Sequence, residues 1–264
     1  MGRESSDYSG AVIGAALDAE DIQIWTDVDG VLTADPRIIE RPLKITTLSF
    51  QEAYELSFFG AKVLHPNTML PAIAKGIPIH IYNSRRPAGN GTLVGDVPGA
   101  GEPVVKSVAY RRNVTLLRIT PRRRQHQFVL WEHVYNVLAK FVSGILLSAT
   151  SEYTMSIVAD AKVDLDGIAR DIGEMGDVER VDGQAILCIV GTSLRNCEGL
   201  MFRTFGALGA CGINGIAFGP SSSSMILVVD DARVLDAVRS VHDALFGAAN
   251  HNHVFEPLSA ATLS

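Results

Sequence analysis

The sequence places two carboxylates and an arginine directly after a short apolar stretch. Residues 22–25 are typical of a buried strand, and the chain continues as Thr26-Asp-Val-Asp-Gly30 and then Asp35-Pro-Arg37. Ligands of open α/β sheets bind beyond the carboxyl ends of the strands, where these polar groups would lie. The planar guanidinium of Arg37 is suited to phosphate. The stretch is therefore well placed for chemistry on a phosphate-bearing ligand.

Three interpretations of this stretch remain open on these residues alone. The first is a strand followed by a polar turn, in which Asp and Gly serve turn geometry only. In the second, DVDGVLT resembles the first motif of haloacid-dehalogenase-type phosphatases, where the first Asp is the nucleophile, the second an acid/base and Mg²⁺ the cofactor. In the third, TDVDGVLTADPR resembles the nucleotide-binding loop of aspartate kinases, which follows a strand in the same way.

The composition is that of an ordinary globular protein. Of the 264 residues 47% are hydrophobic and 20% are charged, which is compatible with one large domain or two to three small ones. A net charge of −6 argues against a general nucleic-acid binder. No apolar run approaches the ~20 residues of a membrane span. We therefore expect neither a nucleic-acid nor a membrane partner.

The cysteines and histidines indicate the cellular compartment of the protein and whether it has a metal site. The three cysteines lack CxxC spacing and sit among apolar residues, so we expect free thiols in a reducing cytoplasm. The amino terminus has no apolar signal-peptide core. His251 and His253 are the one pair with metal-like spacing, and we interpret them as a surface feature. We predict no metal site.

The first hundred residues alternate helical and strand patterns. Ser49-Phe-Gln-Glu52 is a capping box that predicts a helix start, and residues 77–82 predict a strand that leads to the polar Asn83-Ser84. This alternation predicts an α/β layer with a largely parallel sheet. The Gly- and Pro-rich residues 87–106 are the best candidate for a linker.

An internal repeat follows. Met155–Asp160 aligns with Met225–Asp230, and residues 114–120 align with residues 185–191, at a spacing of about seventy residues. Each copy is predicted as strand, helix, strand, strand, helix, strand, the pattern of a ferredoxin-like sheet with helices on one face. The helices are expected near residues 128–141, 163–175, 198–210 and 232–246.

Taken together, these motifs resemble the carboxyl-terminal part of the aspartate kinases. TDVDGVLTADPR, SFQEAYELSFFGAKVLHP and GIPIHIYNSRRPAGNGT stand in family order and precede the two repeats. The resemblance implies an α/β fold, with a partial amino-acid-kinase (carbamate-kinase-like) αβα layer followed by two ferredoxin-like βαββαβ ACT domains. We expect boundaries at 1–96, 107–182 and 183–258, although in this family one ACT unit can be inserted within the other.

The phosphatase is then a remote alternative. Ser84 and Gly95-Asp96 imitate its second and fourth motifs, but Gly95 follows Ser84 by only eleven positions. That distance leaves no room for the lysine-bearing third motif and another strand.

The resemblance assigns roles to individual residues. Thr26 and Asp27 should contact the base and ribose of ATP, and Arg37 and Lys62 should hold its phosphates. ATP with Mg²⁺ would be the cofactor and L-aspartate the substrate, giving 4-phospho-L-aspartate in the first step of lysine, threonine and methionine biosynthesis. The acceptor carboxylate is already ionised at pH 7, so no strong general base is needed.

The amino terminus departs from the family pattern. Arg3, Ser6 and Asp7 match the family positions that contact aspartate or the reacting phosphate, but Glu4 and Ser5 replace two glycines of GRGGSD. Glutamate adds bulk and negative charge where backbone amides would approach phosphate. The family's KFGGTS segment, with its phosphoryl-neutralising lysine, does not occur. We therefore expect the chain as written to be a poor kinase or none, and a non-catalytic regulatory subunit is the alternative.

The predicted effector site also differs from the family pattern. Ser151 and Glu152 match effector-binding positions of the first ACT unit, but Leu146 occupies the place of an Asp that binds the effector's amino group in lysine-sensitive members. An aliphatic side chain cannot pair with an ammonium group, which argues against lysine sensing at this site. The resemblance implies an amino-acid effector, either lysine or threonine. Exposed sheet edges predict pairing through the ACT units, either as a homo-oligomer or with a full-length aspartate kinase.

Overall fold

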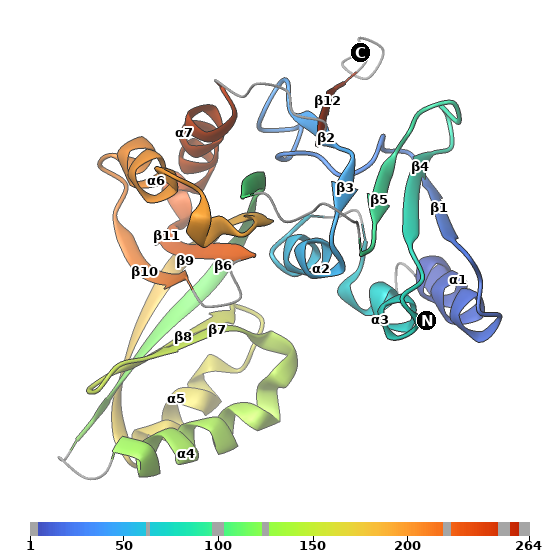
Figure 1. The fold of residues 1–264 in the computed structure, drawn as a ribbon. Helices are drawn as coiled ribbons and strands as arrows, with labels where there is room; N and C mark the ends of the chain where they lie inside the picture. Colours follow the sequence, from blue (N-terminus) through green and yellow to red (C-terminus); the bar gives the residue numbers. More distant parts are fainter. Residues whose placement is uncertain are drawn as a thin grey trace.

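The computed structural model describes residues 5–61, 64–96, 103–122, 127–218, 223–247 and 254–258. These residues form two layered units, each a sheet with helices packed on it (Figure 1). We call the four-stranded sheet with its helices and a short two-stranded sheet the first unit, and the six-stranded sheet with its helices the second unit.

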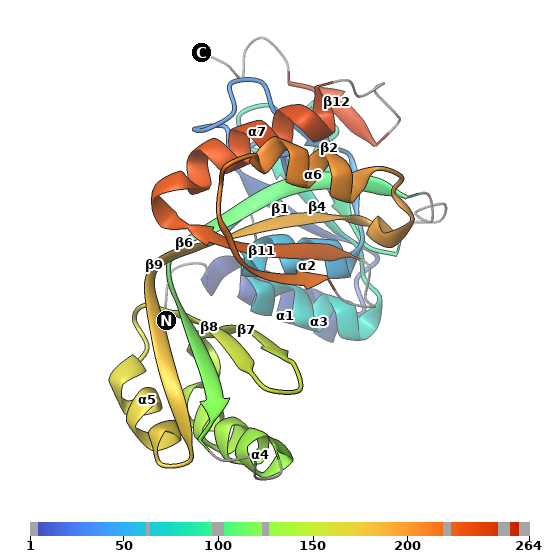
Figure 2. The same cartoon turned by 90° about the vertical axis from the view of Figure 1, so that its left-hand side faces the viewer.

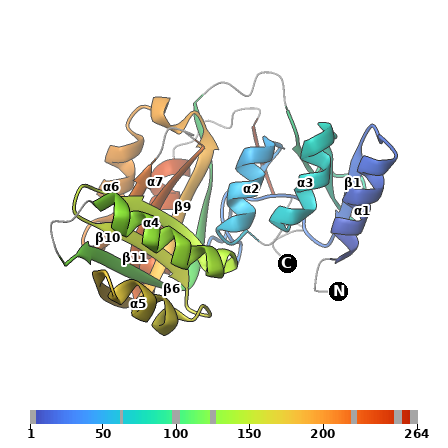
Figure 3. The same cartoon turned by 90° about the horizontal axis from the view of Figure 1, so that it is seen from below.

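The first unit alternates helices and strands. Its elements are α1 (Ser5–Ala16), β1 (Ile22–Thr26), β2 (Leu43–Ile45), β3 (Thr47–Leu48), α2 (Phe50–Phe58), α3 (Pro66–Lys75), β4 (Ile79–Asn83) and β5 (Thr92–Val94). The strand order of the larger sheet is β1-β4-β5-β3, and α2, α3 and α1 lie side by side in Figure 3. Helix α3 ends where predicted, at Gly76 in the left-handed conformation.

The linker prediction was wrong for part of residues 87–106. Strand β5 lies within them and pairs antiparallel with β4, so this sheet is mixed, with β1–β4 and β3–β5 parallel. The chain turns back at Gly91, whose φ is 62°. A Cβ atom there would lie 2.1 Å from the carbonyl oxygen of Ile81, so glycine is required by the close approach of the two strands.

The predicted capping box at the start of α2 is confirmed. The Ser49 hydroxyl accepts from the Glu52 amide at 3.2 Å, and the Glu52 carboxylate accepts from the Ser49 amide at 2.8 Å. We expect Ser49→Ala to lower the free energy of unfolding by about 1 kcal/mol, because one amide of the first helical turn loses its acceptor. Urea unfolding of both proteins measures this difference, and Ser49→Thr, which keeps the hydroxyl, should retain most of the stability. An unchanged midpoint in Ser49→Ala would contradict the cap.

The second unit is one antiparallel sheet crossed by two long strands. Its order is β10-β11-β9-β6-β8-β7. The strands are β6 (Val104–Pro121), β7 (Ile145–Thr150), β8 (Met155–Asp160), β9 (Gly176–Thr192), β10 (Ile213–Phe218) and β11 (Ser224–Asp230). The four predicted helices are present as α4 (Gln127–Leu138), α5 (Leu165–Gly173), α6 (Leu200–Leu208) and α7 (Val234–Phe246).

The sheet has two similar halves that share β6 and β9. One half joins the later part of β6 and the earlier part of β9 to β8 and β7, under α4 and α5. The other joins the earlier part of β6 and the later part of β9 to β11 and β10. The predicted boundary between residues 182 and 183 lies inside β9, and residues 104–111 pair with residues 186–192. The repeated segments occupy equivalent strands, β8 and β11.

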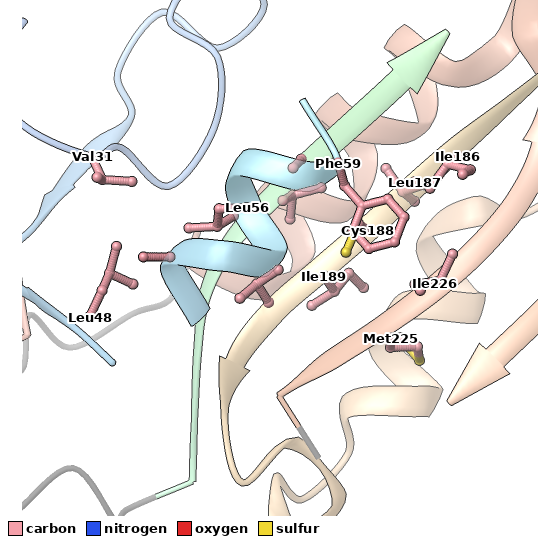
Figure 4. Close-up of a cluster of buried hydrophobic side chains, with 14 of the residues drawn as sticks. Val31, Leu48, Leu56, Phe59, Ile186, Leu187, Cys188, Ile189, Met225 and Ile226 are labelled. Carbon is pink, nitrogen blue, oxygen red and sulfur yellow. The ribbon is translucent and has the colours of Figure 1, made fainter. Parts of the chain in front are cut away.

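The two units share a core. Leu56 and Phe59, at α2, pack with residues of β9 such as Cys188 and Ile189 in one buried cluster (Figure 4). Figure 2 shows α2 on one side of β9 and β11, and α6 and α7 on the other. The second unit is therefore held against the first through α2.

After α7 the chain returns to the first unit. Strand β12 (Phe255–Pro257) pairs antiparallel with β2, as Figure 1 shows. The Lys44 ammonium lies 2.6 Å from the Glu256 carboxylate and holds the pKa of that carboxyl below its usual value. None of the described helices has the length and hydrophobicity to cross a membrane.

Candidate functional site

The loop after β1 lies beside the loop after β4, because the two strands are parallel. The Thr26 carbonyl oxygen accepts from the Ser84 amide at 2.8 Å and from its hydroxyl at 2.9 Å. Asn83 donates to Asp29 at 2.7 Å, and Arg86 pairs with the other Asp29 oxygen at 3.0 Å. The polar residues that follow the two strands therefore meet at one sheet edge. Asp29 is engaged by its neighbours in this network.

Thr26 and Asp27 lie at the tip of β1. The Thr26 hydroxyl donates to the Asp27 carboxylate at 3.3 Å, and the Asp27 side chain is exposed. Gly30, four residues after the end of β1, has φ of 126°, and a Cβ atom there would lie 2.4 Å from the Thr92 hydroxyl oxygen. The glycine lets the loop approach β5 and lets that hydroxyl accept from the Val31 amide at 2.9 Å.

Asp35 and Arg37 form a charged pair at the other end of the loop. The Arg37 backbone amide and Nε donate to Asp35 Oδ1 at 2.9 and 3.0 Å, and its guanidinium also contacts Oδ2. These bonds lower the pKa of the Asp35 carboxyl and raise that of Arg37. Tyr110 of β6 donates to Asp35 Oδ2 at 3.4 Å, and burial raises the pKa of its phenol. Arg37 itself is mostly exposed, with 69% of its side chain accessible.

A pocket of about 270 Å³ opens beside this pair. Its walls come from three segments, namely Val28, residues 30–32 and residues 34–37 of the loop, Gly60 and Ala61 after α2, and residues 107–110 of β6. Most of the lining is apolar, and the charged and polar side chains in it are those of Asp35, Arg37, Ser107 and Tyr110. An apolar pocket with a few convergent polar groups is the usual form of a small-molecule site. Since β6 belongs to the second unit, the pocket lies where the two units meet.

The middle of the loop is hydrogen-bonded to β6. The Thr33 carbonyl oxygen accepts from the Val108 amide at 2.8 Å and from the Ser107 hydroxyl at 3.1 Å. No local pattern in the sequence indicates this contribution of β6, because a contact between residues more than seventy positions apart leaves no periodic signal.

Comparison with known proteins identifies the two units. The amino acid kinase family model matches residues 1–83, and the ACT domain model matches residues 187–245. The lysine-sensitive aspartokinase 3 of Escherichia coli K12 is 32% identical over 254 residues, which cover 93% of this chain and 56% of the enzyme. The chain is homologous to the aspartokinases over 93% of its length. The predicted fold class, a mixed α/β fold with amino-acid-kinase and ACT domains, is thereby confirmed.

Solved aspartokinase structures agree with this assignment. E. coli aspartokinase III in complex with aspartate and ADP, in its R-state, matches with a TM-score of 0.84 at 32% identity, covering 93% of this chain and 56% of that one. The same enzyme with lysine and aspartate, in its T-state, gives a TM-score of 0.75 over the same shares. Of these two structures of the E. coli enzyme, the one with aspartate and ADP thus gives the higher TM-score. The chain spans about half the length of the aspartokinases it matches.

Of the predicted site residues that the structure describes, Arg37 lines this pocket, whereas Thr26 and Asp27, like the residues described next, do not. Ser6 and Asp7 lie in the first turn of α1, where the Ser6 hydroxyl donates to the Asp7 carboxylate at 3.1 Å. Arg3 and Lys62 lie outside the described residues, although Ala61 lines the pocket. His251 and His253 also lie outside the described residues.

The predicted effector residues lie in the second unit. Ser151 follows β7, where its hydroxyl and the Thr154 hydroxyl are 2.8 Å apart and its amide donates to the Thr154 carbonyl oxygen at 2.8 Å. Glu152 is exposed beside it, and Leu146 is buried in β7. Ser151 thus has a structural use in the turn between β7 and β8. Within the described part of the chain, no group of three or more His, Cys, Asp or Glu side chains is arranged to hold a metal ion.

Proposed function

We propose that this chain supplies the nucleotide-binding half of an aspartate kinase, which transfers the γ-phosphoryl group of ATP to the side-chain carboxylate of L-aspartate in the cytoplasm. The observation that carries the proposal is the pocket bounded by the TDVDGVLTADPR loop, with Arg37 in its wall. The structural relative at a TM-score of 0.84 was solved with aspartate and ADP, which supports the same ligands here.

The residues present suit a nucleotide. Phosphoryl transfer depends mostly on positioning and on neutralising the charge of the transferred group, which calls for cations at the phosphates. Arg37 and Lys62 would hold the phosphates, and Thr26 and Asp27 would contact the base and ribose. Mg²⁺ usually keeps several waters and binds through phosphates and one or two carboxylates, so it would arrive with ATP without needing a preformed carboxylate cluster.

The ion pair with Asp35 holds the Arg37 guanidinium in the pocket wall, where it can bind phosphate. Because the Arg37 guanidinium is largely exposed, its pair with Asp35 contributes only about 0–1 kcal/mol to stability. A phosphate group can therefore replace the carboxylate at low cost. Once Arg37 moves, Asp35 keeps the hydrogen bond from Tyr110.

Arg37→Gln should weaken the binding of ATP·Mg²⁺ and leave that of adenosine unchanged. A hydrogen bond to a charged group is worth about 1.5–3 kcal/mol, which corresponds to about a 10- to 150-fold loss of affinity. Isothermal titration calorimetry with both ligands measures the change. Arg239→Gln, which breaks an exposed pair with Asp236 on α7, is the matched control. If Arg37→Gln and the parent bound ATP with equal affinity, Arg37 would not be a phosphate-binding residue.

The function itself is tested by titrating the purified chain with ATP·Mg²⁺ and then assaying aspartate phosphorylation with a coupled enzyme. Binding with turnover establishes a kinase. Binding without turnover supports the nucleotide half and indicates that Arg3, Ser6 and Asp7 need further groups to complete the aspartate site. The absence of ATP binding at millimolar concentration would contradict the proposal.

A non-catalytic regulatory subunit is the second candidate, favoured by the ACT match and the extended sheet. We assign residues 114–182 to one ACT unit and residues 104–111 with 184–246 to the other, an interleaved arrangement. The effector would be lysine or threonine, bound near Ser151 and Glu152. The edge strands β7 and β10 offer unpaired backbone for a second copy or for a full-length aspartate kinase. Calorimetric titration with each amino acid distinguishes this function from the first.

A further inference from the structure

We propose that His242, on α7 of the second unit, is a positioning residue for the nucleotide loop, which it holds through the hydroxyl of Thr33. The inference rests on the proposed function insofar as the loop binds ATP. The contact itself joins residues 209 positions apart, and its two side chains are both buried.

The hydrogen bonds around Thr33 fix the direction of this contact. His242 Nε2 lies 3.0 Å from the Thr33 hydroxyl oxygen, which also accepts from the Leu43 amide at 3.0 Å. A threonine hydroxyl has one proton to donate. Because Thr33 is fully buried and Leu43 offers a donor, the acceptor for that proton is the imidazole nitrogen. We therefore assign His242 as the neutral tautomer with its proton on Nδ1, which leaves Nε2 as the acceptor.

The imidazole is held in place from both sides of the junction between the units. Its ring stacks on Phe246 of the same helix, with centroids 4.7 Å apart, and Phe246 meets Phe255 edge-on at 5.9 Å. Phe255 belongs to β12, which pairs with β2 next to the loop. Burial lowers the pKa of His242, which keeps the acceptor nitrogen free of a proton near neutral pH.

The position of Thr33, fixed by His242, in turn fixes the position of the Asp35–Arg37 pair. Its amide donates to the Leu43 carbonyl oxygen at 2.9 Å, and its carbonyl oxygen accepts from Val108. Every hydrogen-bonding group of Thr33 is thus engaged, and Asp35 follows two residues later. A shift of α7 relative to β2 would move Thr33 and with it the carboxylate that orients Arg37. His242 consequently connects the second unit to the phosphate-binding end of the loop.

The test uses Thr33→Val, which replaces the hydroxyl by a methyl group, and His242→Phe, which keeps the aromatic stacking and removes the acceptor. Each should weaken ATP·Mg²⁺ binding by about 5- to 30-fold, the loss expected for one buried hydrogen bond. The double variant should bind no more weakly than either single one, because the two side chains act as a unit. Thr33→Ser, which keeps the hydroxyl, should rescue binding. Adenosine, which lacks phosphates, should bind all variants within twofold of the parent.

A merely structural role predicts a different result. Thr33→Val and Thr33→Ser would then bind ATP equally well, and this outcome overturns the inference while leaving the proposed function intact. Should His242→Phe fail to fold, the comparison of the valine and serine variants still decides.

Hydrogen exchange gives a readout that does not depend on nucleotide. The backbone amides of residues 31–39 should exchange at least 5-fold faster in Thr33→Val than in the parent, with α5 unchanged as an internal control. If the parent binds no ATP, the proposed function fails, and this exchange measurement alone decides the inference. Equal exchange in the loop of parent and variant would overturn it.

Discussion

Replacing Lys106 by methionine is expected to lower the free energy of unfolding by about 3–5 kcal/mol. Lys106 and Glu52 are each 2% exposed and pair at 2.8 Å. The Glu52 carboxylate also accepts from the Thr192 hydroxyl at 2.6 Å and from the Ser49 amide at 2.8 Å. Removing the ammonium leaves a desolvated carboxylate without a cation. Because Glu52 is on α2, Lys106 on β6 and Thr192 on β9, the pair joins the first unit to the second.

Urea unfolding followed by circular dichroism measures the loss. Lys75→Met, at the exposed pair with Asp18, is the control and should change stability by less than about 1 kcal/mol. Adding Glu52→Gln to Lys106→Met should recover part of the loss, because the neutral amide oxygen still accepts from Ser49 without the cost of a buried charge. If Lys106→Met were as stable as Lys75→Met, the buried pair would not hold the two units together.

Gly60→Ala is expected to destabilise the chain by about 2–6 kcal/mol, the combined cost of backbone strain and overpacking. Its φ of 122° is one that residues with a Cβ rarely adopt, and a Cβ atom there would lie 2.3 Å from the carbonyl oxygen of Tyr110. That oxygen belongs to the backbone of β6, so it cannot turn aside as a side chain would. Gly60 and Tyr110 both line the pocket, and we expect ATP binding to weaken with stability.

Gly76→Ala is the matched control. Gly76 also has a positive φ, 65°, but no atom lies within 4 Å of its added Cβ position, so the expected loss is only about 1 kcal/mol. The difference between the two variants, measured by urea unfolding, isolates the close approach of the chain after α2 to β6. Equal losses would show that this approach is not tight.

Local signals in the sequence predicted the local structure well. The apolar run before Thr26 is β1, and the Ser49–Glu52 spacing is the capping box of α2. The repeated Met155–Asp160 and Met225–Asp230 segments are equivalent strands because both carry the same apolar pattern. Each of these features depends on side chains that are neighbours in the sequence, and the hydrophobic period or a cap records them directly.

Pairing between strands that are distant in the sequence leaves no such local signal. Strand β5 has only three residues in a Gly- and Pro-rich stretch, too few to show a period, so the composition of this stretch predicts a linker instead. Strands β6 and β9 run through both halves of their sheet, so no loop marks a domain boundary within them. The wall of the pocket formed by β6 is set by pairing between strands and not by the local pattern of residues 107–110.

In the candidate site, too, the sequence predicted residues that are close in the chain and not those that the fold brings together. Asp35 and Arg37 are two residues apart, and the DPR motif was enough to expect a cation there. Tyr110 and His242 gave no such signal. A tyrosine in an apolar strand and a histidine on the buried face of a helix are both common in cores, and only the fold brings them to the loop.

The most direct test of the account is to map the ATP·Mg²⁺ site by backbone amide NMR of the isotope-labelled chain. We predict that ATP shifts or broadens the signals of residues 26–37 and of Gly60, Ala61 and Tyr110, and leaves those of α4 and α5 in place. Adenosine should shift the signals near Thr26 and Asp27 but not those near Arg37. Shifts confined to the second unit away from the pocket, or no shifts at millimolar ATP, would contradict the proposed nucleotide site.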